Sequence, residues 1–329
     1  GVGVGEAALS PPAYSLLSDY FSEDKLPRAL AVYTLGITLG GGLAYMVGGG
    51  VYGYFAGIEF VEVPWLGELR PWQLTFVAVG APGLLVVLLM LFMREPPRPS
   101  AHKVRAASGD GEADVALAEV LAWLRSHWQA YSSLIFGVSL LSVLGYGTMA
   151  WYVEFLVRSF DVSRSEAGTS FGLLFIVAGS LGTIIGGWSA GPLQRRGYAD
   201  ANMRLVMIVA LLWFFPAVAG PLLPTAELAL WAAAPIVFFL NAYFAVSIAA
   251  LQLITPNRMR AQASALMLFS TNLFGLALGP SAVAAFTDFV FMDDASLRYS
   301  LSLLAALVCP AAALLVAWGL RYYRSALTT

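Results

Sequence analysis

Long apolar stretches separated by short polar or proline-containing breaks recur along the whole 329-residue chain. A helix needs about 20 apolar residues to cross the hydrocarbon core of a bilayer. By this measure the sequence predicts nine spans, at residues 1–21, 29–56, 73–93, 129–157, 167–190, 203–222, 228–254, 262–287 and 297–320. The strands of a membrane β-barrel would be about ten residues long with alternating polarity, and these stretches lack that pattern. We therefore predict an all-α membrane protein.

The composition supports a membrane location and excludes several other classes. Hydrophobic residues make up 59% of the chain, charged residues make up 12%, and the mean hydropathy is +0.75, whereas soluble domains carry about 25% charged residues. A single very large buried core is the alternative, but the chain has too little polar surface to cover it. The net charge of −2 provides no basic surface for nucleic acid. One cysteine and two histidines form no disulfide framework and no zinc pattern, so we expect no cofactor.

One long hydrophilic break, at residues 94–127, divides the predicted spans into three and six. It is too polar to pack and too long for a tight turn, so we interpret it as a linker between two bundles. Near its end, the apolar residues fall at the helical spacing i, i+3, i+4 and i+7, which predicts a short amphipathic helix. They are Leu117, Val120, Leu121 and Leu124. This helix would lie on the cytoplasmic membrane face or dock a partner helix. The predicted domains are residues 1–94, 95–127 and 128–329.

The basic residues predict the orientation of the spans, because Lys and Arg favour cytoplasmic loops. If the first span runs inward, 14 of the 18 Lys and Arg residues fall in cytoplasmic segments. The C-terminus is then expected to be cytoplasmic.

The two groups of spans show a weak repeat. The loops DYFSEDKLPRALAVY and ITPNRMRAQASAL both run through Pro and then Arg-Ala into a new span, and six spans separate them. Transporters are usually built from matched halves. We therefore expect nine helices out of twelve, in a chain truncated at its N-terminal side.

Several passages resemble a known transporter family. The first part contains GVGVGEAALSPPAYSLLSDYF, RALAVYTLGITLGGGLAYMVGG and PWQLTFVAVGAPGLLVVLLMLFMREPPR. These look like helices four to six of a major facilitator superfamily transporter, most of all of the spinster-like branch and its bacterial relatives. The second part contains YGTMAWYVEFLVRSF, which resembles helix seven, and LQLITPNRMRAQASALMLFSTNLFGLALGP, which resembles helices ten and eleven.

The resemblance implies two six-helix bundles around a central cavity that opens alternately to each side of the membrane. Spinster-like relatives are associated with amphiphilic substrates such as lysolipids and sphingoid lipids, commonly with proton coupling, and bacterial relatives are broader. We expect a monomer in the bacterial inner membrane, with lipid, a small or lipid-like solute and protons as its partners.

Two motifs depart from the family pattern. The cytoplasmic signature G-x-x-x-D-R-x-G-R-R has a second copy in the family, which appears here as GGWSAGPLQRRG. Gly191 and Pro192 replace its Asp and Arg, and only the basic pair Arg195 and Arg196 remains. In helix seven the family's W-x-P-x-F has Val153 in place of Pro.

Glu6 is the only acid predicted to lie deep in a span. At 1.5 Å per residue it lies about 20 Å along its helix from Asp19, which should mark the cytoplasmic edge. A carboxylate there is costly unless it is paired, protonated or in contact with water, and Ser10 lies on the same face. We interpret Glu6 as the proton-coupling or gating carboxylate, with a structural carboxylate as the alternative. The family's arginine on this helix would precede Gly1.

The seventh helix carries four further candidates. Glu154 is four residues from Arg158, which favours an interfacial ion pair, with a role in the substrate cavity as the alternative. Tyr146, Trp151 and Tyr152 fit either an aromatic belt at the membrane interface or the wall of a substrate path.

Amides inside spans are also candidates for the cavity wall. Asn241 and Gln252 are eleven residues apart, on one face of a helix, and Asn272 lies in the next span. They either face water or hydrogen-bond between helices. Four small-xxx-small pairs predict close helix packing: Gly36/Gly40, Gly49/Gly53, Gly182/Gly186 and Gly275/Gly279.

These observations together predict a secondary active transporter, not an enzyme. The sequence GWSAG matches G-x-S-x-G, but it ends a predicted membrane helix, whereas a nucleophile elbow follows a strand. We predict alternating access, with proton coupling favoured by Glu6, for a small or amphiphilic organic solute. The alternatives are a carrier for organic anions and a non-transporting membrane receptor or scaffold.

Overall fold

The structure is a computed structural model that describes residues 26–55, 57–63, 67–92 and 117–327. The chain divides into two units, Gly1–Gly40 with Phe55–Asp114, and Gly41–Tyr54 with Val115–Thr329. Within the described residues, eight helical segments are long and apolar enough to cross a membrane. They coincide with the second to ninth predicted spans, and the first predicted span lies outside the described residues.

Two long helices and a small hairpin follow one another at the start of the described chain. Helix α3 spans Leu26–Phe55, and α4 spans Pro71–Leu91. Between them, β1 (Val61–Val63) pairs antiparallel with β2 (Gly67–Leu69), a hairpin that the sequence did not predict. Pro71 suits the first position of α4, where no backbone N–H is needed. No residue of α4 is buried in the described chain, and a helix that is apolar on all sides without being buried is typical of a membrane span.

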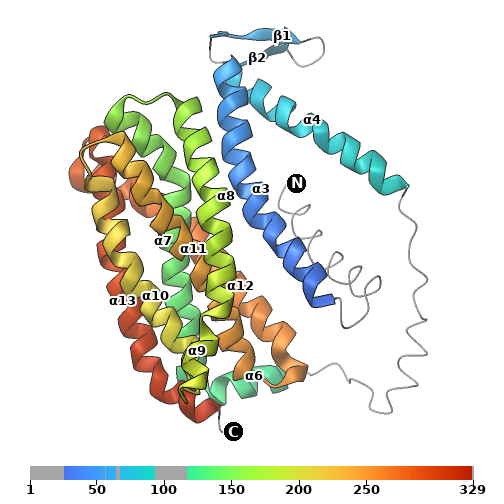
Figure 1. Cartoon of the computed structure of the whole chain (residues 1–329), viewed down its shortest axis with the longest axis vertical. Coiled ribbons are helices and arrows are strands. Elements are labelled where there is room, and N and C mark those ends of the chain that lie inside the picture. Colours follow the sequence, from blue (N-terminus) through green and yellow to red (C-terminus); the bar gives the residue numbers. More distant parts are fainter. Residues whose placement is uncertain (1–25, 56, 64–66, 93–116, 328–329) are drawn as a thin grey trace. The chain divides into compact units, whose positions relative to one another are not determined.

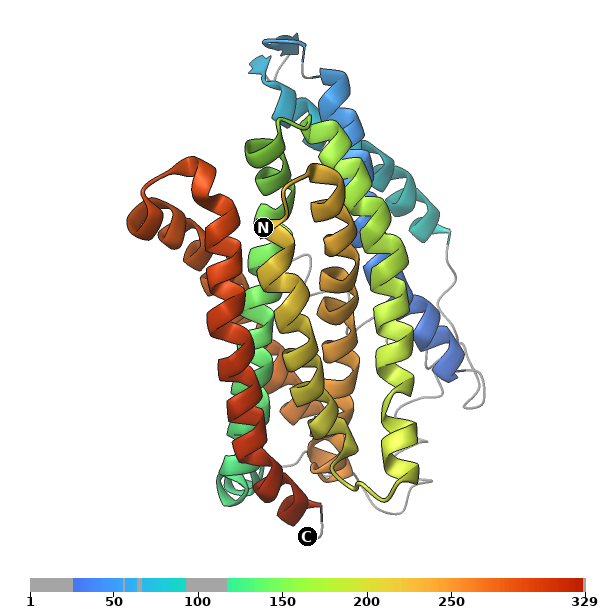
Figure 2. The same ribbon diagram turned by 60° about the vertical axis from the view of Figure 1, so that its left-hand side comes forward.

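Six long helices of the second unit form one bundle (Figure 1, Figure 2). They are α7 (Trp128–Phe160), α8 (Arg164–Trp188), α10 (Ala201–Ala219), α11 (Ala226–Leu253), α12 (Arg260–Ala285) and α13 (Leu297–Ala326). Shorter helices are α6 (Leu117–Ser126) and α9 (Ala190–Arg195), with 3₁₀ turns at Gly220–Leu222, Asn257–Met259 and Asp294–Ser296 and a π-helical turn at Phe286–Phe291. Helix α6 covers the segment whose apolar spacing predicts a helix, and its placement at a membrane surface stays a prediction.

Helix α7 is the centre of the bundle. It packs most extensively against α12 and α13, while α8 packs against α11, and α10 packs against both α11 and α13. The largest fully buried side chains include Trp213, Tyr152, Tyr323, Phe155 and Phe171. Aromatic rings of this size supply much of the apolar area that holds such a bundle together.

Glycines set the closest helix contacts. A Cβ atom on Gly186 would lie 2.6 Å from the carbonyl oxygen of Ala242, and one on Gly182 would collide with the carbonyl oxygen of Phe238, so α8 touches the backbone of α11. Gly275 and Gly279 bring α12 equally close to α7. These two predicted pairs are confirmed, and Gly49 and Gly53 likewise meet Ser165 of α8. At Gly36 and Gly40 a Cβ would meet none of the described atoms within 4 Å.

Candidate functional site

Two of the predicted site residues, Glu6 and Ser10, lie outside the described residues. The proton-coupling role of Glu6 therefore stays a prediction. The other candidates lie in the second unit, and the structure places them in different environments.

Tyr146 and Asn272 form a polar pair on the surface of the bundle. The Tyr146 hydroxyl on α7 donates a 2.8 Å hydrogen bond to Oδ1 of Asn272 on α12. Apolar side chains surround the pair along α12, where Leu273 is 49% exposed and Leu276 is 57% exposed. Both residues were predicted as candidates, but their contact with each other was not predicted. This hydrogen bond uses the Tyr146 donor, and the two N–H groups of Asn272 make no hydrogen bond to a described residue.

Trp151 joins the same two helices further along α7. Its indole Nε1 donates a 2.9 Å hydrogen bond to the carbonyl oxygen of Pro280 on α12. The Arg158 guanidinium lies over the Trp151 ring, 5.8 Å from its centre. Trp151 therefore holds α7 against α12 and connects the polar pair with the charged end of α7.

Tyr152, the next residue, points into the bundle. It is 1% exposed, and its hydroxyl donates a 2.7 Å hydrogen bond to the carbonyl oxygen of Ala229 on α11. Its ring stacks on Phe171 of α8 with 5.3 Å between ring centres. These contacts are those of a core residue, and they favour a structural role for Tyr152 over one in the wall of a substrate path.

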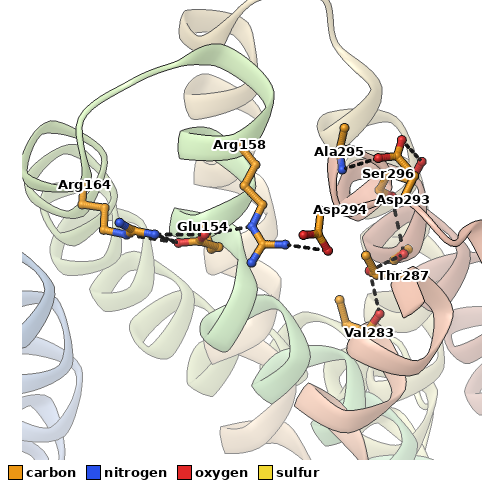
Figure 3. Close-up of polar contacts among 10 residues, drawn as sticks. Glu154, Arg158, Arg164, Val283, Thr287, Asp293, Asp294, Ala295 and Ser296 are labelled. Carbon is orange, nitrogen blue, oxygen red and sulfur yellow. Dashed lines mark hydrogen bonds and ion pairs between the residues drawn. The ribbon is translucent and has the colours of Figure 1, made fainter. Parts of the chain in front are cut away.

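Glu154 anchors an ionic cluster at the end of α7 (Figure 3). Its carboxylate lies 2.8 Å from Nε of Arg158 and 3.2 Å from Nη2 of Arg164, which is the first residue of α8. Arg158 also reaches Asp294, which precedes α13, at 3.6 Å. The i,i+4 pair with Arg158 that the sequence favours is present. Arg164 and Asp294 were missed because nothing in the sequence places these loops beside α7.

The two amides of α11 differ in their surroundings. Asn241 is half-buried, and its Nδ2 donates a 2.9 Å hydrogen bond to the carbonyl oxygen of Val237, one turn earlier. Gln252 is exposed and lines a cavity of about 590 Å³ near the end of the helix. Arg195 and Arg196, the remnant of the cytoplasmic signature, are both exposed at the end of α9.

A second ionic cluster escaped the sequence reasoning altogether. Asp200, just before α10, has a side chain only 2% exposed and pairs with Arg204 at 2.6 Å and with Arg324 of α13 at 3.2 Å. The Arg204 guanidinium also lies over the Tyr198 ring, 4.6 Å from its centre. The four-residue spacing of Asp200 and Arg204 was a visible signal, whereas the contact with α13 was not.

A bundle of membrane-length helices joined by such polar contacts defines a multi-pass membrane protein. The sequence model of the Major Facilitator Superfamily matches residues 2–280. The chain belongs to this superfamily of membrane transporters, which confirms the predicted family and fold class.

Relatives support the predicted spinster-like branch. The chain is 28% identical over 300 residues to an MFS-type efflux pump of Mycolicibacterium smegmatis, covering 88% of this chain and 61% of the pump. It is 30% identical over 206 residues to protein spinster homolog 1 of Bos taurus, covering 56% of this chain and 34% of that protein. The chain thus spans about three-fifths of the length of the first relative and a third of the second. The first is named as an efflux pump of this superfamily, whose members are transporters and not enzymes.

A solved structure shares the fold. The crystal structure of a bacterial homolog to the human lysosomal transporter Spinster, inward-facing and unoccupied, matches with a TM-score of 0.71 at 23% sequence identity. The match covers 99% of this chain and 76% of that chain.

Proposed function

We propose that this protein is a secondary active transporter that moves a small or amphiphilic organic solute across the membrane by alternating access. The proposal rests on the family and on one observation, the Tyr146–Asn272 hydrogen bond on an exposed, otherwise apolar surface of α7 and α12. Polar groups inside a membrane protein are costly unless they serve a partner or a water-filled path. A bacterial inner membrane, a cytoplasmic C-terminus and a monomeric state complete the proposal.

The chemistry of this surface suits an amphiphile. The N–H groups of Asn272 can donate to a polar head group. On the same two helices, Phe136 of α7, ten residues before Tyr146, and Phe274 of α12 lie with ring centres 6.0 Å apart and offer apolar contact for a hydrocarbon chain. The Asn272 donors also suit a carboxylate, so a carrier for small organic anions is the second candidate.

Transport by the full chain in proteoliposomes tests the proposal. A lysophospholipid, a sphingoid base and a sugar acid, each with and without a pH gradient, separate the two candidates. We expect Asn272→Ala to lower the rate about tenfold for the transported solute, the cost of about one hydrogen bond in the transition state. Asn241→Ala, which removes an amide bonded to its own helix, should leave the rate unchanged. Binding without transport would favour a receptor or scaffold.

Proton coupling is proposed through Glu6. A carboxylate can carry a proton only if its charge changes during the cycle, and Glu6→Gln removes that change. We expect Glu6→Gln to abolish the stimulation by a pH gradient while transport down a solute gradient continues. If the stimulation persists in this variant, Glu6 has only a structural role.

A further inference from the structure

A second polar site lies within the bundle, away from the Tyr146–Asn272 pair. The site is the cavity of about 590 Å³ that Gln252 lines. Its walls come from α9, from the last turns of α8 and α11, and from the first turns of α10 and α12. Its polar lining consists of Gln194, Asn202, Gln252 and Arg260, and Trp188 lies at its rim with 78% of its surface exposed. No Asp or Glu is among the residues that line it.

Arg260 is held in place by the protein backbone. Its Nε donates to the carbonyl oxygens of Gln252 at 3.0 Å and Thr255 at 3.2 Å. Its two terminal nitrogens make no hydrogen bond to any residue in the described part of the chain. A guanidinium fixed through Nε presents these terminal N–H groups as a planar pair of donors.

Asn202 adds an amide to the cavity wall. It is 4% exposed, it lines the cavity, and its side chain makes no hydrogen bond to a described residue. The amide atoms are not sealed off from solvent, so they can bond to a polar group that enters the cavity. Across from it, Gly187 and Gly191 leave the wall open, since a Cβ on either would meet no described atom within 4 Å.

We propose that this cavity binds a phosphate group of an anionic molecule, either the head group of an anionic phospholipid or a small soluble phosphate. Phosphate accepts two parallel hydrogen bonds from a guanidinium, and the three amides supply further donors. The exposed indole of Trp188 suits the boundary between lipid and water. Arg195 and Arg196 are close in sequence to the cavity lining and add positive charge that attracts anions. The site does not depend on the proposed transport function.

Binding to the detergent-purified full chain tests this proposal. The probes are short-chain phosphatidylglycerol, short-chain phosphatidylcholine, glycerol 3-phosphate and inorganic phosphate, measured by native mass spectrometry and by ligand-induced thermal shift. We expect phosphatidylglycerol to bind and phosphatidylcholine to bind at least tenfold more weakly. Competition by glycerol 3-phosphate or inorganic phosphate would identify a soluble phosphate as a sufficient ligand. If neither soluble phosphate competes, the ligand is the phospholipid.

Two independent variants locate the site. Arg260→Gln removes the charge and Gly191→Leu fills the cavity, so each should weaken phosphatidylglycerol binding at least tenfold, while Arg260→Lys should retain part of it. Arg258→Gln is the matched control, because this exposed arginine does not line the cavity, and it should bind like the unaltered chain. The proposal would be overturned if both Arg260→Gln and Gly191→Leu bound phosphatidylglycerol as tightly as the unaltered chain does. It would also be overturned if the chain showed no preference for the anionic lipid. Thermal unfolding without ligand checks that each variant is folded.

Discussion

The bundle carries an ionic cluster beyond each end of α8, and the two clusters differ in burial. Beyond its start, the Glu154 side chain is 22% exposed and its partners Arg158 and Arg164 are 31% and 52% exposed. Beyond its end, the Asp200 side chain is 2% exposed between Arg204 and Arg324. Water and salt weaken the first cluster, whereas the second encloses a charge that depends on its partners. The buried cluster is therefore expected to fix helix positions, and the exposed one to break and reform at little cost.

Asp200→Asn should have the largest effect on stability. The substitution keeps the shape of the side chain but leaves two arginines without their carboxylate, which we expect to cost about 2 kcal/mol. The midpoint of thermal unfolding in detergent should fall by about 5 °C. Asp161→Asn is the matched control, because Asp161 has φ +56°, a conformation that Asn tolerates equally well. A midpoint equal to that of the control would show that the buried cluster contributes nothing.

Glu154→Gln should have a smaller effect. The amide can still accept a hydrogen bond from Arg158, so only the charge attraction is lost, at about 0.5 kcal/mol. In 1 M salt, where charges are screened within about 3 Å, the difference from the unaltered chain should disappear. The destabilisation by Asp200→Asn should persist in the same salt. If both variants respond alike to salt, the contrast in burial does not govern the two clusters.

Asp294→Asn should have the smallest effect. Asp294 lies 3.6 Å from Arg158, and its side chain is 86% exposed, so solvent screens most of the attraction. We expect no measurable change in the unfolding midpoint. A decrease as large as that of Glu154→Gln would mean that the exposed cluster acts as one network of four charges.

The sequence predicted helices far better than contacts. Every described span lies where the hydropathy places it, because a helix in lipid must satisfy its backbone internally and so needs a long apolar run. The hairpin at Val61–Val63 and Gly67–Leu69 was missed, since three-residue strands leave almost no pattern. The pairing of Tyr146 with Asn272 joins residues 126 apart, which helical periodicity cannot reveal.

The amides of α11 also show that the sequence predicts a helix but not its contacts. Their spacing of eleven residues correctly places Asn241 and Gln252 on similar sides of one helix. Their environments differ because burial depends on neighbouring helices: Asn241 bonds to its own helix, and Gln252 lies beside the cavity at the helix end. The proposed phosphate site was likewise not predictable from the sequence, because its lining comes from the ends of five helices.

The glycine contact between α8 and α11 has a mechanical consequence. Where main chain rests directly on main chain, there are no flexible side chains to absorb a change in spacing. We therefore expect the two helices to move together as one rigid unit. In the proposed transport cycle, the protein would then have to bend elsewhere.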